Sequence, residues 1–291
     1  MDYQDHFKQT AKLIEKTCSE LIPLTDKAYN EIFIAARYSL LAGGKRLRPL
    51  LAILTAQMLG IPPDQSVASS CALEMIHTYS LIHDDLPCMD DDDFRRGKPS
   101  LHKAFPEGIA VLAGDYLLTY AFEVLVNAKH LNADQKLELI SVLAKSSGGD
   151  GMIAGQVMDI MAAEVDLTRL KQTHLNKTGM LIAASMEFGA IIGKATIEQQ
   201  NLLRQFGLDI GLAFQIVDDI LDVTQSQEKH GRNVPSDLIN GKTTYVSLIG
   251  LKESKSLAKS LTDKALINLK NLPFDTNPLE ILTDSLVNRQ I

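Results

Sequence analysis

Long apolar segments with helical spacing and no proline limit the fold of this chain more than any other feature. They cover residues 31–42, 110–128, 178–193 and 199–222. Before Asp84, the side chains that follow the i, i+3, i+4, i+7 pattern of one helix face are Ala72, Met75, Ile76, Tyr79, Ile82 and His83. Strand signals are nearly absent, because no sustained period-2 alternation occurs and no Asn-Gly or Asp-Gly turn lies between two β-branched runs. The sequence therefore predicts an all-helical fold.

Breaks between the predicted helices fall at short segments with glycine, proline or clustered acids, at 60–63, 84–106, 148–151, 231–241 and 271–278. Near the end, Asn277 reads as an N-cap, Pro278 as the first helical residue and Glu280 as a capping-box glutamate. No low-complexity linker or fixed-period repeat divides the chain. We therefore predict one domain over residues 1–291, a bundle of about ten or more helices in which those that are apolar all round lie at the centre.

Composition and charge exclude several classes of protein. The formal net charge of -7 argues against a nucleic-acid binder, and an anionic substrate would need a local basic patch or a metal ion. Three cysteines are too few and too odd in number for a disulfide framework, so reduced thiols are expected. The N-terminus does not resemble a signal peptide, and no run of about eighteen apolar residues occurs. We predict a soluble, cytoplasmic protein without a membrane span.

The first of two acidic clusters follows the predicted helix directly, with aspartates at 84, 85 and 90–93. An isolated acidic run is usually a solvated loop. This run, however, is entered from an apolar helix through His83 and is followed by Arg95, Arg96 and Lys98. An EF-hand is a poor match, because the loop glycine and the terminal glutamate at the required spacing are missing. The local pattern favours a site over a solvated loop.

The second acidic cluster is the sharper signal. Gln215, Asp218, Asp219 and Asp222 fall at i, i+3, i+4 and i+7, so all four lie on one helix face. The other residues between 211 and 223 are apolar or glycine, and no lysine or arginine accompanies the acids. A like-charged stripe on an otherwise buried helix is costly unless it binds a cation. The stripe therefore predicts a cation site.

Carboxylates without a histidine or cysteine ligand set suit magnesium, which keeps several waters and completes its shell with phosphate oxygens. Two such clusters on facing helices would form a magnesium–diphosphate clamp. Cations that suit phosphate occur at Lys45, Arg46 and Arg48, although a basic surface turn would have the same composition. Four further basic groups are weaker signals when read singly: Arg95 with Arg96 and Lys98, Lys177 with Thr178, Lys242, and His77.

With these residues in view, the chain resembles the all-helical trans-prenyltransferases of the farnesyl and geranylgeranyl diphosphate synthase family. The resemblance rests on motifs in the expected order at 43–49, 84–90, 95–99, 155–159, 174–179, 218–222 and 241–245, and it spans roughly residues 30 to 250. The first aspartate motif has the bacterial form with a two-residue insertion. The resemblance implies the isoprenoid synthase fold, with a deep central substrate cavity, and a homodimer.

The resemblance also implies a role for each matched residue. Isopentenyl diphosphate would be bound by Lys45, Arg48, His77 and Arg96. Magnesium, as three ions, would be held by Asp84, Asp85, Asp90, Asp218, Asp219 and Asp222. The allylic diphosphate or its developing cation would be contacted by Arg95, Lys177, Thr178, Gln215 and Lys242. Arg232 stands where the family usually has a lysine, so that contact is a departure from the pattern.

The reaction implied is the joining of isopentenyl diphosphate to dimethylallyl and then geranyl diphosphate, which gives farnesyl diphosphate. Tyr79 and its neighbour Ser80 are expected to limit the length of the product. Geranylgeranyl diphosphate synthase is the nearest alternative. A terpene cyclase would not need the basic group of Lys45, Arg46 and Arg48, and an inactive regulatory subunit should have lost one aspartate motif.

Overall fold

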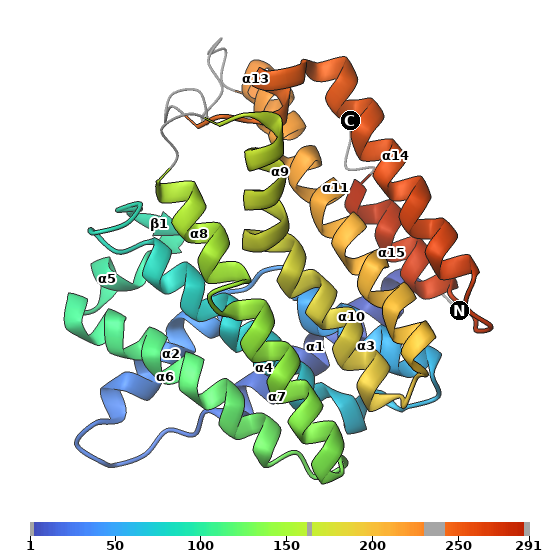
Figure 1. Cartoon of the computed structure of the whole chain (residues 1–291). Helices are drawn as coiled ribbons and strands as arrows, with labels where there is room; N and C mark the ends of the chain where they lie inside the picture. The colour runs from blue at the N-terminus through green and yellow to red at the C-terminus, as the bar shows by residue number, and fades with distance from the viewer. Residues whose placement is uncertain (1–2, 162–164, 230–241, 288–291) are drawn as a thin grey trace. The chain divides into compact units, whose positions relative to one another are not determined.

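The structure, a computed structural model, describes residues 3–161, 165–229 and 242–287, except for the side chains of 225–229. These residues are almost entirely helical (Figure 1). The first half of the chain holds α1 (Tyr3–Leu21), α2 (Asn30–Leu40), α3 (Leu47–Met58), α4 (Pro63–Asp84), β1 (Phe94–Arg95), β2 (Lys98–Pro99), α5 (Leu101–Ala104) and α6 (Glu107–Val126). The second half holds α7 (Ala133–Ser147), α8 (Met152–Ile160), α9 (Leu167–His174), the π-helix η1 (Leu175–Gly179), α10 (Met180–Ile192), α11 (Ile197–Lys229), α13 (Tyr245–Ile249), α14 (Leu251–Lys270) and α15 (Asn277–Val287).

The chain divides into two units, one made of 1–140 with 191–193 and the other of 141–190 with 194–291. Within the first unit, α4 packs against α1, α2, α3 and α6. Most of its residues are buried, which fits a helix that is apolar nearly all round, and its one buried carboxylate is Glu74 at 1% exposure. The prediction of one domain over 1–291 stays a prediction.

In the second unit, α11 packs against η1, α13, α14 and α15. Its apolar face contributes Ile216, Val217 and Ile220 to a core cluster with Tyr245 and Ala258. Three polar residues of the same helix, Gln215, Asp218 and Asp222, are partly exposed. A helix of this pattern buries one stripe and presents the other, so α11 holds its carboxylates at the boundary of the core.

The predicted helical segments are confirmed in α2, α6, α10 and α11, and the predicted break at 84–106 contains β1, β2 and α5. The predicted break at 231–241 lies outside the described residues. One cap was predicted a residue too late. The last helix begins at Asn277, and the carbonyl of Thr276 accepts from the amide nitrogens of Leu279 and Glu280. Thr276 Oγ1 also donates to Glu280 at 2.6 Å, so Thr276 takes the place expected of Asn277.

By length and composition, α6 is apolar enough to cross a membrane, the only helix among the described residues that passes this test. The expectation of no span rested on uninterrupted apolar runs, and α6 is interrupted by Asp115 and Glu123. In the first unit this helix packs against α2 and α4, with 39% of its most apolar 18-residue stretch buried.

Candidate active site

The acidic loop that follows α4 is held by Arg95 from β1. Asp85 is 2% exposed, and one of its oxygens accepts hydrogen bonds from Arg95 Nε at 2.8 Å and from a terminal nitrogen of the same guanidinium. That nitrogen also donates to Asp92 at 2.7 Å. Burial raises the pKa of Asp85, and the Arg95 guanidinium opposes the rise. Arg95 therefore stabilises two aspartates of the loop, and its contact with an allylic diphosphate stays a prediction.

Lys103 on α5 pairs with two further aspartates of the loop, with Nζ 2.9 Å from Asp93 and 3.5 Å from Asp91. The other two predicted ligands are joined through the backbone, because the N–H of Asp90 donates to the carbonyl of Asp84 at 2.9 Å. Asp84 is partly exposed and Asp90 is exposed. The fold of the loop thus brings these two carboxylate-bearing residues together at the end of α4.

A tight turn, which the sequence did not predict, sets the direction of the Arg96 side chain. Arg96 and Gly97 connect β1 to β2 with φ angles of 53° and 76°, both in the left-handed region that two-residue hairpins require. A non-glycine residue in this region is strained. The Arg96 guanidinium donates to the carbonyl of Gly43 and lies against Gly44, where an added Cβ would fall 2.7 Å from its Cζ. Gly44 therefore makes room for the Arg96 guanidinium, and the carbonyl of Gly43 accepts its hydrogen bond.

Three of the residues predicted to bind isopentenyl diphosphate come together in the first unit. Arg96 lies 3.5 Å from Nε2 of His77, and burial lowers the pKa of the partly buried Arg48 to about 10. Burial, together with the positive charges of Arg48 and Arg96, lowers the pKa of His77 well below its usual value. His77 is therefore neutral at pH 7 and adds hydrogen bonding without adding charge. Lys45, the fourth residue, is exposed on the loop before α3.

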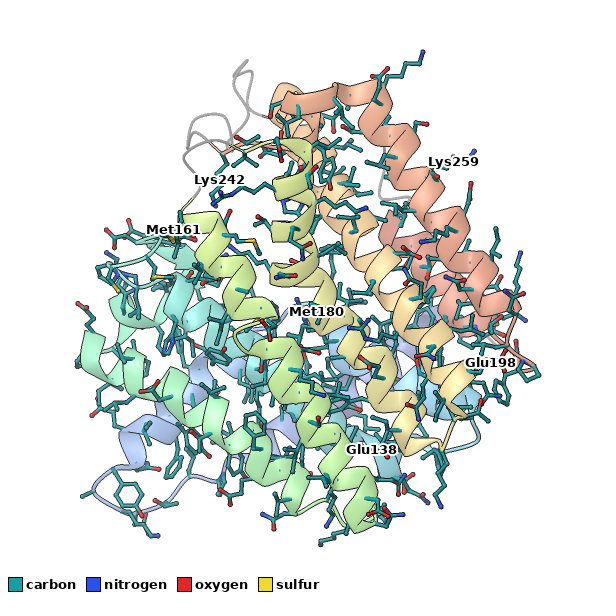
Figure 2. All side chains as sticks on the ribbon, in the orientation of Figure 1. Glu138, Met161, Met180, Glu198, Lys242 and Lys259 are labelled. Carbon is teal, nitrogen blue, oxygen red and sulfur yellow. The ribbon has the colours of Figure 1, made fainter. Side chains whose placement is uncertain are left out.

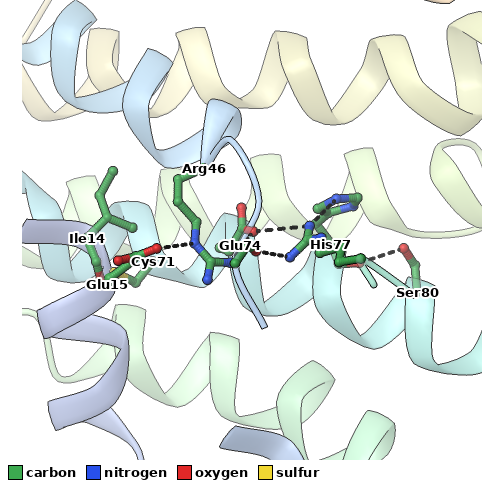
Figure 3. A network of polar contacts seen from close by, with 9 residues as sticks. Ile14, Glu15, Arg46, Cys71, Glu74, His77 and Ser80 are labelled. Atoms are coloured by element: carbon green, nitrogen blue, oxygen red, sulfur yellow. Dashed lines mark hydrogen bonds and ion pairs between the residues drawn. The ribbon is translucent and has the colours of Figure 1, made fainter. Parts of the chain in front are cut away.

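Arg46 differs from its neighbours in this motif. Figure 3 shows its side chain between Glu15 of α1 and Glu74 of α4. The distances to the two carboxylates are 3.8 Å and 3.0 Å, and Arg46 is 2% exposed. The prediction that all three cations of the motif suit phosphate is therefore wrong for Arg46, which forms a buried ion pair. Glu74 carried no role in the sequence reading, although a lone acid in an apolar helix is itself a signal.

The acidic stripe on α11 has the predicted spacing, and its members differ in burial. Gln215, Asp218 and Asp222 are partly exposed on one side of the helix. Asp219 is 9% exposed and accepts a hydrogen bond of 2.8 Å from the backbone N–H of Tyr245, the first residue of α13. One oxygen of Asp219 thus caps the N-terminus of α13. A negative charge is favourable there, because the N-terminal end of a helix carries a partial positive charge.

Lys177 and Thr178 lie on η1, a π-helical turn between α9 and α10. Such turns are rare and occur often at functional sites. Lys177 Nζ donates to Asp159 of α8 at 2.6 Å, and Thr178 Oγ1 donates to the side-chain oxygen of Gln215 on α11 at 2.9 Å. The π-helical turn therefore connects α8 to α11 through two adjacent polar side chains, a connection that residue spacing did not indicate.

Glycines allow the helices around η1 to approach closely. An added Cβ at Gly155 of α8 would lie 2.1 Å from the backbone nitrogen of Lys177, and one at Gly211 of α11 would lie 2.7 Å from the Cα of Gly179. No side chain fits at these distances. The backbone that carries Lys177 is thus fixed from two sides.

Tyr79, predicted to limit product length, is 5% exposed on α4. Its hydroxyl has no hydrogen-bond partner among the described residues, and burial raises its pKa to about 12. Its ring meets that of His83 edge-on, with 5.7 Å between the centroids. The neighbouring Ser80 hydroxyl donates to the carbonyl of His77 at 2.9 Å, so it is hydrogen-bonded to the backbone of its own helix.

Two predicted contacts lie at the edge of the described structure. Lys242, labelled in Figure 2, is exposed just before α13, and Arg232 lies outside the described residues. In the second unit, buried polar atoms without a partner among the described residues occur at Gln156 Oε1 and His174 Nδ1. Burial lowers the pKa of His174 to about 4, so this ring is neutral at pH 7.

In the described part of the chain, no three histidine, cysteine, aspartate or glutamate side chains converge as a ready-made metal site. The clusters at Asp84 with Asp90, and at Asp218 with Asp222, instead offer few carboxylates each. This fits magnesium, which commonly binds one or two carboxylates and takes its other ligands from water and phosphate.

Comparison with known proteins supplies the family. A model of the polyprenyl synthetase family matches residues 30–271. The chain is 43% identical over 300 residues to the large subunit 1 of a heterodimeric geranylgeranyl pyrophosphate synthase of Arabidopsis thaliana, covering 99% of this chain and 80% of the relative. It is 44% identical to a geranylgeranyl pyrophosphate synthase of Capsicum annuum, with 99% of this chain and 79% of the relative covered.

Two solved structures match the fold of this chain. An FPP/GFPP synthase of Zymomonas mobilis matches with a TM-score of 0.88 at 36% identity, covering 98% of this chain and 99% of that one. A geranyltransferase of Helicobacter pylori, complexed with magnesium and isoprenyl diphosphate, matches with a TM-score of 0.83 at 33% identity, covering 99% and 97%. The predicted all-helical isoprenoid synthase fold is confirmed.

The fold and these matches define a prenyltransferase. The chain belongs to the polyprenyl synthetase family, and its activity is that of a short-chain prenyl diphosphate synthase.

Proposed function

We propose that this enzyme condenses isopentenyl diphosphate with dimethylallyl diphosphate and its longer allylic homologues. The observation that carries the proposal is the grouping of Arg48, His77 and Arg96, which come from α3, α4 and the β1–β2 turn. Isopentenyl diphosphate keeps its diphosphate through the reaction, so it needs a basic group of its own. This group must be separate from the carboxylates that hold magnesium for the departing diphosphate of the allylic substrate. A terpene cyclase, which uses one diphosphate, would not need it.

Magnesium fits the residues available. Asp84, Asp85 and Asp90 would hold it on one side, and Asp218, Asp219 and Asp222 on the other, with three ions per site as the family resemblance implies. One oxygen of Asp85 accepts hydrogen bonds from Arg95, and one oxygen of Asp219 accepts a hydrogen bond from the Tyr245 amide, so both carboxylates are held in place by neighbouring groups. When bound, magnesium neutralises the charge that develops on a departing diphosphate. That the two clusters face each other stays a prediction.

In the proposed reaction, the C–O bond of the allylic diphosphate breaks and a new carbon–carbon bond forms to the double bond of isopentenyl diphosphate. A proton then leaves for the released diphosphate. Lys177 and Thr178, fixed on η1, would stabilise the departing phosphates through charge-assisted hydrogen bonds. Arg48 and Arg96 would hold isopentenyl diphosphate, with neutral His77 as a hydrogen-bond partner. The apolar helices would exclude water, which would otherwise trap the carbocation as an alcohol.

Two product lengths compete, and each has its own support. The relatives from Arabidopsis and Capsicum are named as geranylgeranyl pyrophosphate synthases, which favours a twenty-carbon product over the predicted farnesyl diphosphate. The buried ring of Tyr79 is the observation that favours fifteen carbons. Incubating the purified enzyme with isopentenyl diphosphate and each allylic primer, followed by chromatography of the dephosphorylated products, decides between them.

The predicted homodimer and the cytoplasmic location stay predictions. The Arabidopsis relative is named as one subunit of a heterodimer, so a second, different subunit is the alternative partner to test. Light scattering of the purified chain would separate a self-associated dimer from a monomer.

Turnover is expected to require a divalent cation. The carboxylates at Asp84, Asp90, Asp218 and Asp222 would repel an incoming diphosphate without one. Dialysis against EDTA should abolish product formation, and added magnesium should restore it, whereas calcium, which prefers larger and more flexible shells, should restore it less. Unchanged turnover in metal-free buffer would contradict the proposed magnesium clamp.

The two basic groups are expected to serve different substrates. Arg48→Ala should raise KM for isopentenyl diphosphate by about ten- to a hundredfold, because a hydrogen bond between charged groups contributes about 1.5–3 kcal/mol. Lys177→Ala should chiefly lower kcat, since its ammonium stabilises charge that appears as the allylic bond breaks. Steady-state kinetics with one substrate varied at a time give both values. An unchanged KM for isopentenyl diphosphate in Arg48→Ala would show that the site lies elsewhere.

A further inference from the structure

A buried carboxylate lies at the centre of the basic group in the first unit. Glu74 is 1% exposed, and its Oε1 is 3.0 Å from a terminal nitrogen of Arg46 and 3.8 Å from one of Arg96. Figure 3 shows Glu15, Arg46, Glu74 and His77 in a row, and Arg96 connects Glu74 to His77. The row joins α1, the loop before α3, α4 and the β1–β2 turn.

Glu74 acts on all three arginines of this region. It pairs with Arg46 and Arg96 directly, and its negative charge raises the pKa of Arg48 against the lowering caused by burial. Three guanidinium groups held this close would repel one another, and the charge of Arg96 already lowers the pKa of Arg48. A single buried carboxylate offsets this repulsion before any substrate is present.

The position of Glu74 also explains why the neighbouring arginines of the 43–49 motif differ. Arg46 adopts a left-handed backbone, with φ of 49°, and is almost fully buried beside Glu74. Its ion pair fixes the start of α3 to α4. Arg48, two residues after Arg46, is thereby placed near His77, which is three residues after Glu74 and so lies on the same face of α4.

We propose that Glu74 is a positioning residue for isopentenyl diphosphate. Its carboxylate holds Arg96 directly, and through Arg46 it holds the start of α3, which carries Arg48, in the arrangement that receives a diphosphate. The inference rests on the proposed function, since it assigns a role within the same isopentenyl diphosphate site. Glu74 itself does not contact the substrate, because a carboxylate beside a diphosphate would repel it.

Glu74→Gln is the first test, because it keeps the shape of the side chain and removes its charge. We expect KM for isopentenyl diphosphate to rise by about tenfold or more, while kcat at saturating substrate and KM for the allylic diphosphate change by less than about threefold. Glu74→Asp, which retains the charge on a shorter stem, should recover part of the loss. A merely structural role for Glu74 would instead lower the amount of folded enzyme and leave both KM values unchanged.

A second variant guards against misfolding, because Glu74→Gln leaves Arg46 buried without a charged partner. The double variant Arg46→Gln with Glu74→Gln removes both charges together and should fold. KM for isopentenyl diphosphate should remain raised in it, because Arg96 still lacks its carboxylate. A value within about twofold of the unmodified enzyme, or a loss confined to kcat, would overturn the proposal.

Calorimetric titration with isopentenyl diphosphate, without an allylic partner, separates this inference from the proposed function. Turnover by the unmodified enzyme tests the proposed function, and the ratio of the dissociation constants of Glu74→Gln and the unmodified enzyme tests Glu74. Binding by the unmodified enzyme that weakens about tenfold in the variant supports the positioning role. Equal binding by both overturns it even if turnover is normal, and no binding by either together with no turnover overturns both proposals.

Discussion

Asp84→Ala or Asp218→Ala is expected to lower the rate of condensation by orders of magnitude while the chain stays folded. Each change removes a predicted magnesium ligand from a cluster that offers few carboxylates. Loss of one ligand at a charge-stabilising metal removes several kcal/mol from the transition state, and about 1.4 kcal/mol corresponds to a tenfold change in rate. Initial rates with both substrates and magnesium, measured beside circular dichroism of each variant, give the result.

The chain offers matched controls for both changes. Asp93 lies in the same loop as Asp84 but is exposed and pairs with Lys103 at 2.9 Å. Asp263 is an exposed acid of α14 in the second unit. Asp93→Ala and Asp263→Ala should keep rates within a few-fold of the unmodified enzyme. A near-normal rate in Asp84→Ala or Asp218→Ala would identify that cluster as a solvated acidic surface.

Tyr79→Ala is expected to lengthen the product by at least one five-carbon unit, whichever length the unmodified enzyme releases. Tyr79 lies five residues before Asp84 on α4, and a rise of 1.5 Å per residue places it about 7–8 Å deeper in the helix bundle. A hydrocarbon tail anchored by its diphosphate at Asp84 would meet the buried ring at that depth. Chain-length analysis of the dephosphorylated products is the measurement.

Tyr79→Phe is the control that the structure itself suggests. Because the Tyr79 hydroxyl has no hydrogen-bond partner among the described residues, its removal should leave both fold and product length unchanged. Truncation of a buried ring costs about 3–5 kcal/mol, so thermal unfolding of Tyr79→Ala must show a folded protein before its products are interpreted. A folded Tyr79→Ala that releases the original product would show that another residue limits the chain.

The helices could be predicted from the sequence because apolar residues recur along it with the period of an α-helix. Segments such as 199–222 are apolar on the buried face and polar on the other, and α11 has that pattern. The aspartate stripe could be predicted for the same reason, since Asp218 and Asp222 are one turn apart on any helix. Local spacing is enough where one regular element carries the whole feature.

Features that depend on contacts between distant segments were not predicted. The left-handed turn at Arg96 and Gly97 has neither the Asn-Gly nor the Asp-Gly pair that marks such hairpins. The Arg96 side chain packs against Gly44 and donates to the carbonyl of Gly43, about fifty residues earlier in the chain. Arg46 and Arg48 look alike in the sequence. Only the approach of α4, with Glu74, determines that Arg46 is buried in an ion pair. Tertiary contacts decide these roles, and spacing along the chain does not record them.

The π-helical turn η1 has a consequence for how this enzyme tolerates insertions and deletions. From Leu167 to Ile192 the chain is one unbroken helical stretch, and η1 places an extra residue within it. Deleting one residue from η1 would restore a regular α-helix, which is the more stable form. Because the wider turn absorbs the extra residue locally, the deletion would leave α9 and α10 close to their present relative rotation and would change the position of Lys177 and Thr178. The extra residue therefore widens the helix at the one turn that carries Lys177 and Thr178, and a deletion there should impair these two side chains while leaving α9 and α10 aligned.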